Sequence, residues 1–239
     1  MLPLASIHEC LRAVIHATTK DESRYALDGV HFEFNGELMR TVATDGHRLA
    51  LGERTFDGSV PRLAEVLIPR KAVGEILKLK GETVEFAHDE NCLLVKAEGV
   101  TLIARKLSGN FPDYKMVMPE SSRVVLVVER AQMLEEVSRA LLLADERNRA
   151  IALTLTDAGV TVKASTGAGE HESFVGGEYE TEVAGVTVSC NGNYLVDALK
   201  SMSTPQVIFK ITDADRQMEI VNQGGSTCDQ RNVIMPMRV

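Results

Sequence analysis

The feature that most constrains this chain is an internal repeat, because the same order of helix and strand patterns appears twice along it. Apolar side chains at helical spacing begin each copy, and alternating strand patterns follow. Landmarks recur about 120–125 positions apart, as with Arg24 and Arg149 after the first helix of each copy. The helical patterns cover residues 3–20, 70–79, 130–143 and 193–202. Hairpin patterns in the second copy cover 151–164 and 207–221.

This repeat predicts two similar domains of class α+β, each with two helices packed on antiparallel sheets. A length of 239 residues suits two such domains, each large enough to bury its own core. The segment PESSR (119–123) is rich in turn-forming residues and is the natural boundary. We therefore expect domains at 1–120 and 121–239.

Composition narrows the location and the chemistry. The net charge is −8, which argues against a partner held by broad phosphate neutralisation. The four cysteines are isolated from one another, without metal-ligand spacing, and indicate thiols of a reducing compartment. The sequence contains no apolar run of membrane-spanning length and no signal-peptide pattern at its start. We expect a cytoplasmic protein without a metal or cofactor.

Basic residues gather on the polar faces of the predicted helices. On the first helix, His8, Arg12, His16 and Lys20 follow one another at a spacing of four. The second helix carries Lys71 and Lys78 on one side, with Arg70 at its start. The later helices are less uniform, since Arg139 shares its face with glutamates and Lys200 lies beside Asp197. These faces are either solvated surfaces or a weakly basic lining for a phosphate backbone.

The stretch VATDGHRLAL (42–51) allows three interpretations. Asp45-Gly46 between apolar runs is typical of a tight hairpin turn. Catalysis through Asp45 and His47 would need a nucleophile, and the sequence has no G-x-S-x-G elbow. A metal site would need more ligands, and His31, His88 and His171 are scattered. The turn is the favoured interpretation.

Five segments together resemble the bacterial sliding clamp family, the beta subunit of DNA polymerase III. They are VATDGHRLAL, RYALDG (24–29), IPRKAV (68–73), FPDY (111–114) followed by Val117 and Pro119, and VIMPMRV (233–239). They occur in the family's order and extend over essentially the whole chain. The resemblance implies a non-catalytic processivity subunit with three similar domains. Two subunits close head-to-tail into a ring around duplex DNA, with sheets outside and helices lining the hole.

The family also has a peptide pocket between its second and third domains. The DNA polymerase III alpha subunit, the clamp loader and repair polymerases insert short motifs there, usually with a Gln and a Leu/Phe end. By motif match, the resemblance implies that the pocket comprises Leu27, Thr44, Gly46, His47, Arg48, Leu49, Pro112, Val117, Asn191, Tyr194, Val233, Ile234, Met235, Pro236, Met237, Arg238 and Val239. Apolar and methionine side chains suit an adaptable slot, and Arg48 and Arg238 would orient polar groups of the partner.

The resemblance assigns weak, non-sequence-specific contact with duplex DNA to the helix faces. The DNA-facing residues would be Arg12, His16, Lys20, Arg24, Arg70, Lys71, Lys78, Arg139 and Lys200. A closed ring stays on DNA by topology, so few phosphate contacts suffice and an acidic balance is tolerable.

The match begins at the family's second domain, while the family's ring contact joins a first domain to a third. We therefore expect a monomer that binds clamp motifs without holding DNA, in preference to a ring of three chains. The alternatives are a non-ring peptide-binding module of the same fold and a hydrolase using Asp45 and His47. Met116 stands where the family often has a basic residue, which leaves partner preference open.

Overall fold

The structure is a computed structural model that describes residues 1–19, 27–57, 65–167, 169–181 and 185–238. The chain forms two compact units, each containing its own hydrophobic core. The first comprises Met1–Tyr114 with Thr227–Gln230, and the second comprises Lys115–Ser226 with Arg231–Val239. The division falls between Tyr114 and Lys115, shortly before the PESSR segment.

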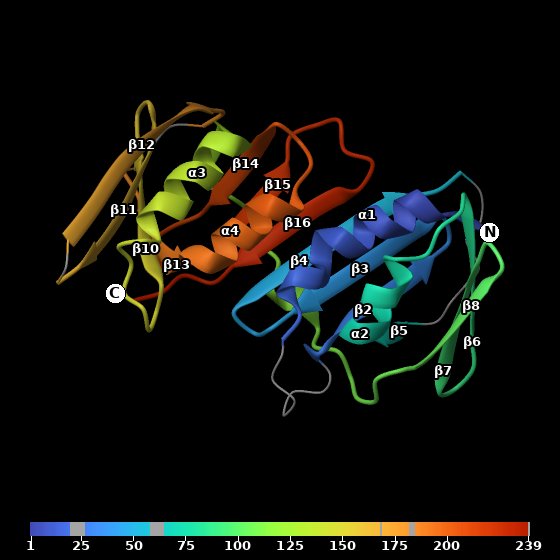
Figure 1. The fold of residues 1–239 in the computed structure, drawn as a ribbon. Helices are drawn as coiled ribbons and strands as arrows, with labels where there is room; N and C mark the ends of the chain where they lie inside the picture. Colours follow the sequence, from blue (N-terminus) through green and yellow to red (C-terminus); the bar gives the residue numbers. More distant parts are fainter. Residues whose placement is uncertain (20–26, 58–64, 168, 182–184, 239) are drawn as a thin grey trace. The chain divides into compact units, whose positions relative to one another are not determined.

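The first unit contains two α-helices and two antiparallel sheets among its described residues (Figure 1). Its larger sheet includes the strand order β4-β3-β2-β5, and a smaller sheet has the order β1-β6-β7-β8. The elements are β1 (Leu2–Pro3), α1 (Leu4–Val14), η1 (Ile15–Ala17), β2 (Gly29–Asn35), β3 (Leu38–Thr44), β4 (Arg48–Thr55), β5 (Val66–Pro69), α2 (Arg70–Ile76), β6 (Thr83–His88), β7 (Cys92–Ala97) and β8 (Val100–Arg105).

Helix α1 forms where the sequence places apolar residues at helical spacing. Ile7, Leu11 and Val14 are fully buried and pack into the core of the first unit. The helix is shorter than the predicted 3–20, because residues 15–17 adopt a 3₁₀ turn after Val14. A 3₁₀ turn has three residues per turn instead of 3.6, so it rotates His16 away from the line through His8 and Arg12.

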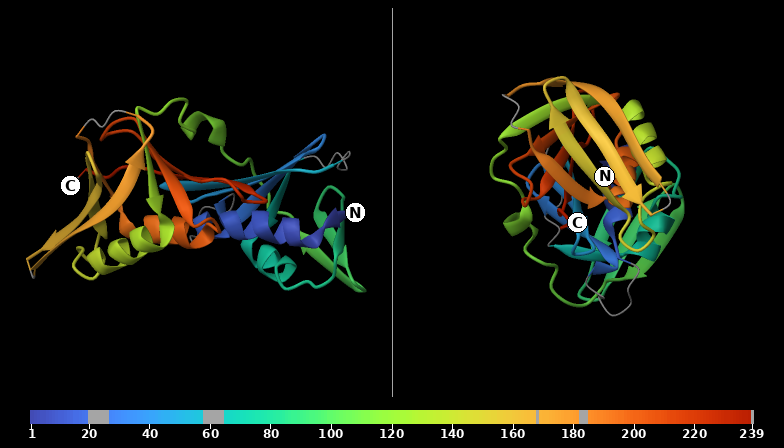
Figure 2. Two further views of the ribbon diagram at one scale, coloured as in Figure 1. Left: turned by 90° about the horizontal axis from the view of Figure 1, so that it is seen from above. Right: turned by 90° about the vertical axis from the view of Figure 1, so that its left-hand side faces the viewer.

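The second unit has the same composition of elements, with two helices beside antiparallel strands. Its strand order is β13-β10-β11-β12-β9-β14-β15-β16. Figure 2 shows α3 and α4 on the same side of these strands. The elements are η3 (Tyr114–Val117), which begins at the last residue of the first unit, β9 (Val124–Glu129), α3 (Arg130–Ala140), β10 (Ala150–Thr156), β11 (Gly159–Thr166), β12 (Gly169–Tyr179), β13 (Thr187–Asn191), α4 (Gly192–Ser201), β14 (Gln206–Ile211), β15 (Met218–Asn222) and β16 (Asp229–Ile234).

The predicted hairpin around Asp157-Ala158-Gly159 is confirmed, and the glycine is required there. Gly159 has φ +153°, and a Cβ at this position would lie 2.1 Å from the carbonyl oxygen of Val175 on β12. Strands β10 and β11 pair on either side of this turn, with Thr156 opposite Gly159. The absence of a side chain thus lets three strands come together.

A short segment near the C-terminus belongs to the first unit. Cys228 is buried in the core of that unit together with Cys10 of α1. The Gln230 Nε2 atom donates to the Ala13 carbonyl oxygen at 3.1 Å, and Arg54 Nη1 donates to the Thr227 carbonyl oxygen at 2.8 Å. Sequence periodicity gave no sign of this long-range attachment.

The predicted α+β class is confirmed, since every strand pair recorded in the described ranges is antiparallel and helices accompany both sets of strands. Among the helices that the structure describes, none combines the length and apolar character needed to cross a bilayer.

Candidate functional site

The turn at residues 44–48 is built by the Asp45 carboxylate. Its Oδ1 accepts hydrogen bonds from the backbone N–H groups of His47 at 2.9 Å and Arg48 at 3.1 Å. Gly46 adopts φ +90°, a conformation that favours glycine. Thr44 Oγ1 donates to the Arg48 carbonyl oxygen at 2.6 Å and closes the turn. These bonds explain why this sequence turns here.

Arg48 holds the turn against the end of the first helical segment. Its side chain is only 11% exposed, and its Nε donates to Asp45 Oδ2 at 3.0 Å. Its Nη2 donates to the His16 carbonyl oxygen at 2.5 Å. The sequence suggested that Arg48 would orient a partner's polar groups, but within the first unit this guanidinium already fixes two parts of the protein to each other.

The contacts of the Asp45 carboxylate explain its place in this motif without catalysis. Both oxygens of Asp45 accept hydrogen bonds from the turn and from Arg48, which gives the carboxylate a structural role. His47 is exposed at the tip, while Leu49 is buried at the start of β4. The imidazole of His47 therefore lies at the exposed tip of the turn.

In the second unit, the predicted pocket residues lie around β13, α4 and the C-terminal tail. Asn191 caps α4 by accepting a hydrogen bond from Asn193 N at 2.9 Å, and Tyr194 of α4 packs partly buried against the core. Met237 N donates to the Ser189 carbonyl oxygen at 2.7 Å, so the tail runs beside the end of β13. The structure thus brings these residues together within one unit.

The remaining pocket candidates differ in exposure. Met235, Pro236 and Met237 are half-buried and Arg238 is exposed, whereas Val233 is buried and Ile234 belongs to the core of the second unit. The Ile234 side chain is therefore committed to that core. In the other segments, Leu27 and Val117 are half-buried, Pro112 is exposed, and Met116 is strongly exposed. Val239 lies outside the described residues.

The basic stripe predicted on α1 is partly wrong. His8 Nε2 is 2.9 Å from the Ile76 carbonyl oxygen of α2, so His8 joins the two helices and does not lie on a free face. Arg12 is exposed as expected, and His16 is half-buried in the 3₁₀ turn. Lys20 and Arg24 lie outside the described residues.

The other basic residues predicted to face DNA also differ in exposure and in ion pairing. Lys71 and Lys200 are exposed, Arg70 is half-buried, and exposed Lys78 pairs with Glu75 at 2.7 Å. Arg139 forms ion pairs with Glu135 at 2.5 Å and with Glu136 at 2.8 Å. These two glutamates neutralise the charge that the sequence offered as a DNA contact on α3.

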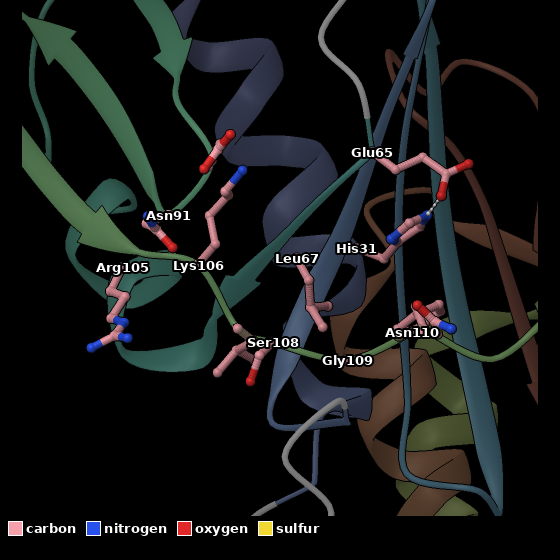
Figure 3. A pocket seen from close by; sticks show the side chains of 12 residues that line it. His31, Glu65, Leu67, Asn91, Arg105, Lys106, Ser108, Gly109 and Asn110 are labelled. Atoms are coloured by element: carbon pink, nitrogen blue, oxygen red, sulfur yellow. Dashed lines mark ion pairs between the residues drawn. The ribbon is translucent and has the colours of Figure 1, made fainter.

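A polar cavity of about 650 Å³ in the first unit was not found by sequence reasoning. Figure 3 shows His31 and Glu65 on one side of it and Asn91, Arg105 and Lys106 on the other. His31 Nε2 is 3.2 Å from Glu33 Oε1 and 4.0 Å from Glu65 Oε2. The spacing His31-x-Glu33 on a predicted strand was the available signal, because alternate residues share a face.

Comparison with protein families covers nearly the whole chain. Residues 1–113 match the central domain of the DNA polymerase III beta subunit, and residues 115–238 match its C-terminal domain. The chain belongs to the DNA polymerase III beta subunit family. The two halves of the sequence repeat are therefore two successive domains of this beta subunit family.

Similar bacterial proteins are named beta sliding clamp. The chain is 31% identical over 242 residues to the beta sliding clamp of Haemophilus influenzae, a match that covers all of this chain and 65% of that protein. It is 29% identical over 243 residues to the beta sliding clamp of Bacillus subtilis, with 99% and 64% covered. The chain thus spans about 65% of the length of these curated relatives.

Solved structures agree with the sequence comparison. A DNA polymerase sliding clamp from Pseudomonas aeruginosa with a ligand superposes at a TM-score of 0.92 and 29% identity, covering all of this chain and 65% of that one. Another structure of the sliding clamp from this organism, bound to griselimycin, gives a TM-score of 0.92 at 28% identity, with 100% and 64% covered. The beta subunit fold is therefore shared over the full length of this chain.

Proposed function

We propose that these residues form part of a DNA sliding clamp, a non-catalytic cytoplasmic processivity factor that encircles duplex DNA and tethers polymerase, loader and repair proteins. The observation that carries the proposal is the unbroken match of two successive beta subunit domains over residues 1–113 and 115–238. Structural similarity at a TM-score of 0.92 to a DNA polymerase sliding clamp supports it.

The proposed tether consists of two peptide-contacting segments, as the family resemblance implies. In the first unit this segment is the turn at 44–49, and in the second it comprises Asn191, Tyr194 and the tail from Val233. Each segment is supported by geometry inside its own unit. Asp45 and Arg48 hold the turn rigid, and the bond between Met237 N and the Ser189 carbonyl oxygen fixes the tail.

The side chains of the proposed groove suit a short apolar motif. Half-buried Met235 and Met237 are flexible and polarisable, so they can adjust to different Leu/Phe ends. Exposed His47 and Arg238 offer hydrogen bonds to the polar part of a motif, such as a Gln side chain. Rigid segments with adaptable side chains would let several partners share one site.

Contact with DNA is proposed to be weak. Arg12, Lys71 and Lys200 are exposed on helices, while Lys78, just after α2, pairs with Glu75 and Arg139 pairs with two glutamates. Few phosphate contacts release few counterions, so binding is labile and the protein can slide. Topology, not affinity, would then retain a closed ring on the duplex.

The groove is tested by titrating this chain with a fluorescent peptide that carries a Gln and a Leu/Phe end. We expect saturable binding that Met237→Ala and His47→Ala each weaken by about tenfold, equivalent to roughly 1.4 kcal/mol. The matched control is Ile103→Ala on β8, which removes a 66% exposed apolar side chain from another part of the first unit. It should bind the peptide normally.

If Met237→Ala and His47→Ala both bind the peptide as tightly as the unmodified chain, the assignment of these residues to the peptide groove is wrong. Griselimycin provides an independent probe, because a related clamp is described with it bound. Competition between griselimycin and the peptide would place both at one site. Encirclement is tested separately. The complete ring that contains these two domains is loaded onto nicked circular DNA by a clamp loader, and the amount of protein retained on the DNA is measured. Retention that is lost on linearisation supports a clamp, whereas peptide binding without retention supports the non-ring module.

A further inference from the structure

Strand register places an unusual row of charges across the larger sheet of the first unit. Glu33 on β2 is opposite Arg40 on β3, and Arg40 is in turn opposite Glu53 on β4. On the other side of β2, His31 pairs with Leu67 and Phe32 with Val66, so continuing the register brings Glu65 opposite Glu33. The row therefore contains three carboxylates and one guanidinium.

The one positive charge of Arg40 does not offset the three negative charges of this row. Arg40 is bonded through Nε to Glu53, and its Nη1 is 3.7 Å from Glu33 Oε2. Glu65 immediately precedes β5, and its carboxylate oxygen lies within 4.8 Å of that of Glu33, so two like charges are close together without a cation between them. His31 lies two residues before Glu33 on the same face of β2 and completes the group.

The imidazole of His31 is held in a fixed orientation at the wall of the cavity. Its side chain is only 8% exposed, and its ring stacks on Phe111 with centroids 4.8 Å apart and planes 4° from parallel. Its Nε2 points towards both glutamates, as the line to Glu65 in Figure 3 indicates. A metal ion bound at Nε2 would replace the proton that this nitrogen directs at the glutamates, and the ring is already fixed, so little further side-chain entropy would be lost.

Glu33 is oriented by a second layer of contacts. Tyr114 Oη donates to Glu33 Oε2 at 3.1 Å, and Arg40 Nη1 is 3.7 Å from the same oxygen. The other oxygen, Oε1, is left directed at His31. Outer contacts of this kind set the direction of metal-binding carboxylates.

We propose that His31, Glu33 and Glu65 form a binding site for a divalent transition-metal ion such as Zn²⁺, open to the cavity on one side. One ligand atom from each residue lies within 4.8 Å of the others. Ligands at about 2.0–2.2 Å from a tetrahedral ion are roughly 3.4 Å apart. The separations of 3.2 Å and 4.0 Å fall on either side of that value.

Only Glu65 needs to move for the ion to bind. Its side chain is 75% exposed at the rim, so a rotamer change brings its carboxylate closer at little cost. One nitrogen and two carboxylate ligands leave a fourth position for water from the cavity. This mixed ligand set suits zinc and other first-row ions better than Mg²⁺, which prefers oxygen ligands alone. Bound metal would connect β2 to Glu65, the residue immediately before β5.

The test is a Zn²⁺ titration of the chelator-treated chain, followed by calorimetry and by competition with a chromogenic chelator. We expect one ion per chain, and we expect Glu65→Gln to weaken the affinity by at least tenfold. Glu65 is exposed, so this variant should fold normally. His31→Gln should have at least the same effect. Zn²⁺ should also raise the melting temperature of the unmodified chain and leave that of Glu65→Gln unchanged.

Two controls separate this site from other zinc ligands. Glu90→Gln alters a carboxylate in the same cavity that is not in the group, and Cys92→Ser removes a half-buried thiol of the same unit. Both variants should bind Zn²⁺ with unchanged affinity. The proposal is overturned if the chain shows no saturable one-to-one binding, or if Glu65→Gln binds as tightly as the unmodified chain. If His31→Gln does not fold, Glu65→Gln decides the outcome alone.

Discussion

Asp45 shows how one side chain can suggest chemistry in the sequence and architecture in the structure. Beside His47 and Arg48 it has the residue types of a catalytic group. Its carboxylate instead accepts two backbone N–H bonds and one bond from Arg48. Aspartate readily bonds to backbone groups two and three residues ahead, which is why it is frequent in turns.

Replacing Asp45 tests this structural role. We expect Asp45→Ala to lower the free energy of unfolding by roughly 1–3 kcal/mol, because the N–H groups of His47 and Arg48 and the Arg48 guanidinium lose an acceptor. Asp45→Asn keeps a side-chain oxygen for the turn and should lose clearly less. Urea denaturation of the three proteins measures the difference. Equal losses for both variants would contradict the turn mechanism.

Buried thiols give the protein a predictable response to alkaline pH. Complete burial raises the pKa of the Cys190 thiol from 9.0 to about 12. The unfolded chain therefore releases this proton before the folded chain does. The stabilising contribution is fully present below pH 9 and is lost as the pH rises from 9 to about 12.

We expect stability to fall by about 1.4 kcal/mol per pH unit from this thiol alone within that window. Cys190→Ala removes the titrating group and should flatten the pH dependence by that amount, whatever its effect at neutral pH. Urea denaturation at neutral pH and midway through the window measures both slopes. Identical slopes in the two proteins would show that Cys190 makes no contribution.

At the scale of elements, the β10–β11 hairpin depends on close contact between backbones. A Cβ on Gly159 would overlap the Val175 carbonyl oxygen of β12, whereas a Cβ on Gly176 would meet no atom within 4 Å. The two glycines face each other across the β11–β12 pair. Their pairing provides a matched comparison within one sheet.

We expect Gly159→Ala to destabilise the second unit by roughly 2–3 kcal/mol, from steric overlap and a strained φ. Gly176→Ala should change the stability by less than about 1 kcal/mol. Thermal and urea denaturation of each variant measure these effects. A tolerated Gly159→Ala would mean that β12 can move away from the turn.

The helices show which structural features hydrophobic periodicity predicts and which it does not. The buried stripe of α1 and the hairpins of the second unit were predictable, because local spacing decides which face turns inward. The end of α1 and the partner of His8 were not, because they depend on packing against residues far along the chain. His8 contacts Ile76, and Arg48 contacts His16, although each pair is far apart in the sequence.

At the scale of the whole molecule, the family assignment leads to a prediction about association. The resemblance implies that family rings close through contact between a first and a third domain. The chain matches the central and C-terminal domains. A polypeptide of residues 1–239 alone should therefore be a monomer, and light scattering should give a mass near 26.1 kDa. A mass near three chains would instead support a ring of three two-domain chains.

The sequence by itself determined the repeat, the α+β class, the apolar faces and the segments that resemble the clamp family. Local spacing and turn chemistry encode these features, so they survive without coordinates. Only the tertiary structure decided that Arg48 bonds to the His16 carbonyl oxygen, that His8 contacts Ile76, and that His31, Glu33 and Glu65 meet at one cavity. These depend on strand register and long-range packing, which bring together residues that no local pattern connects.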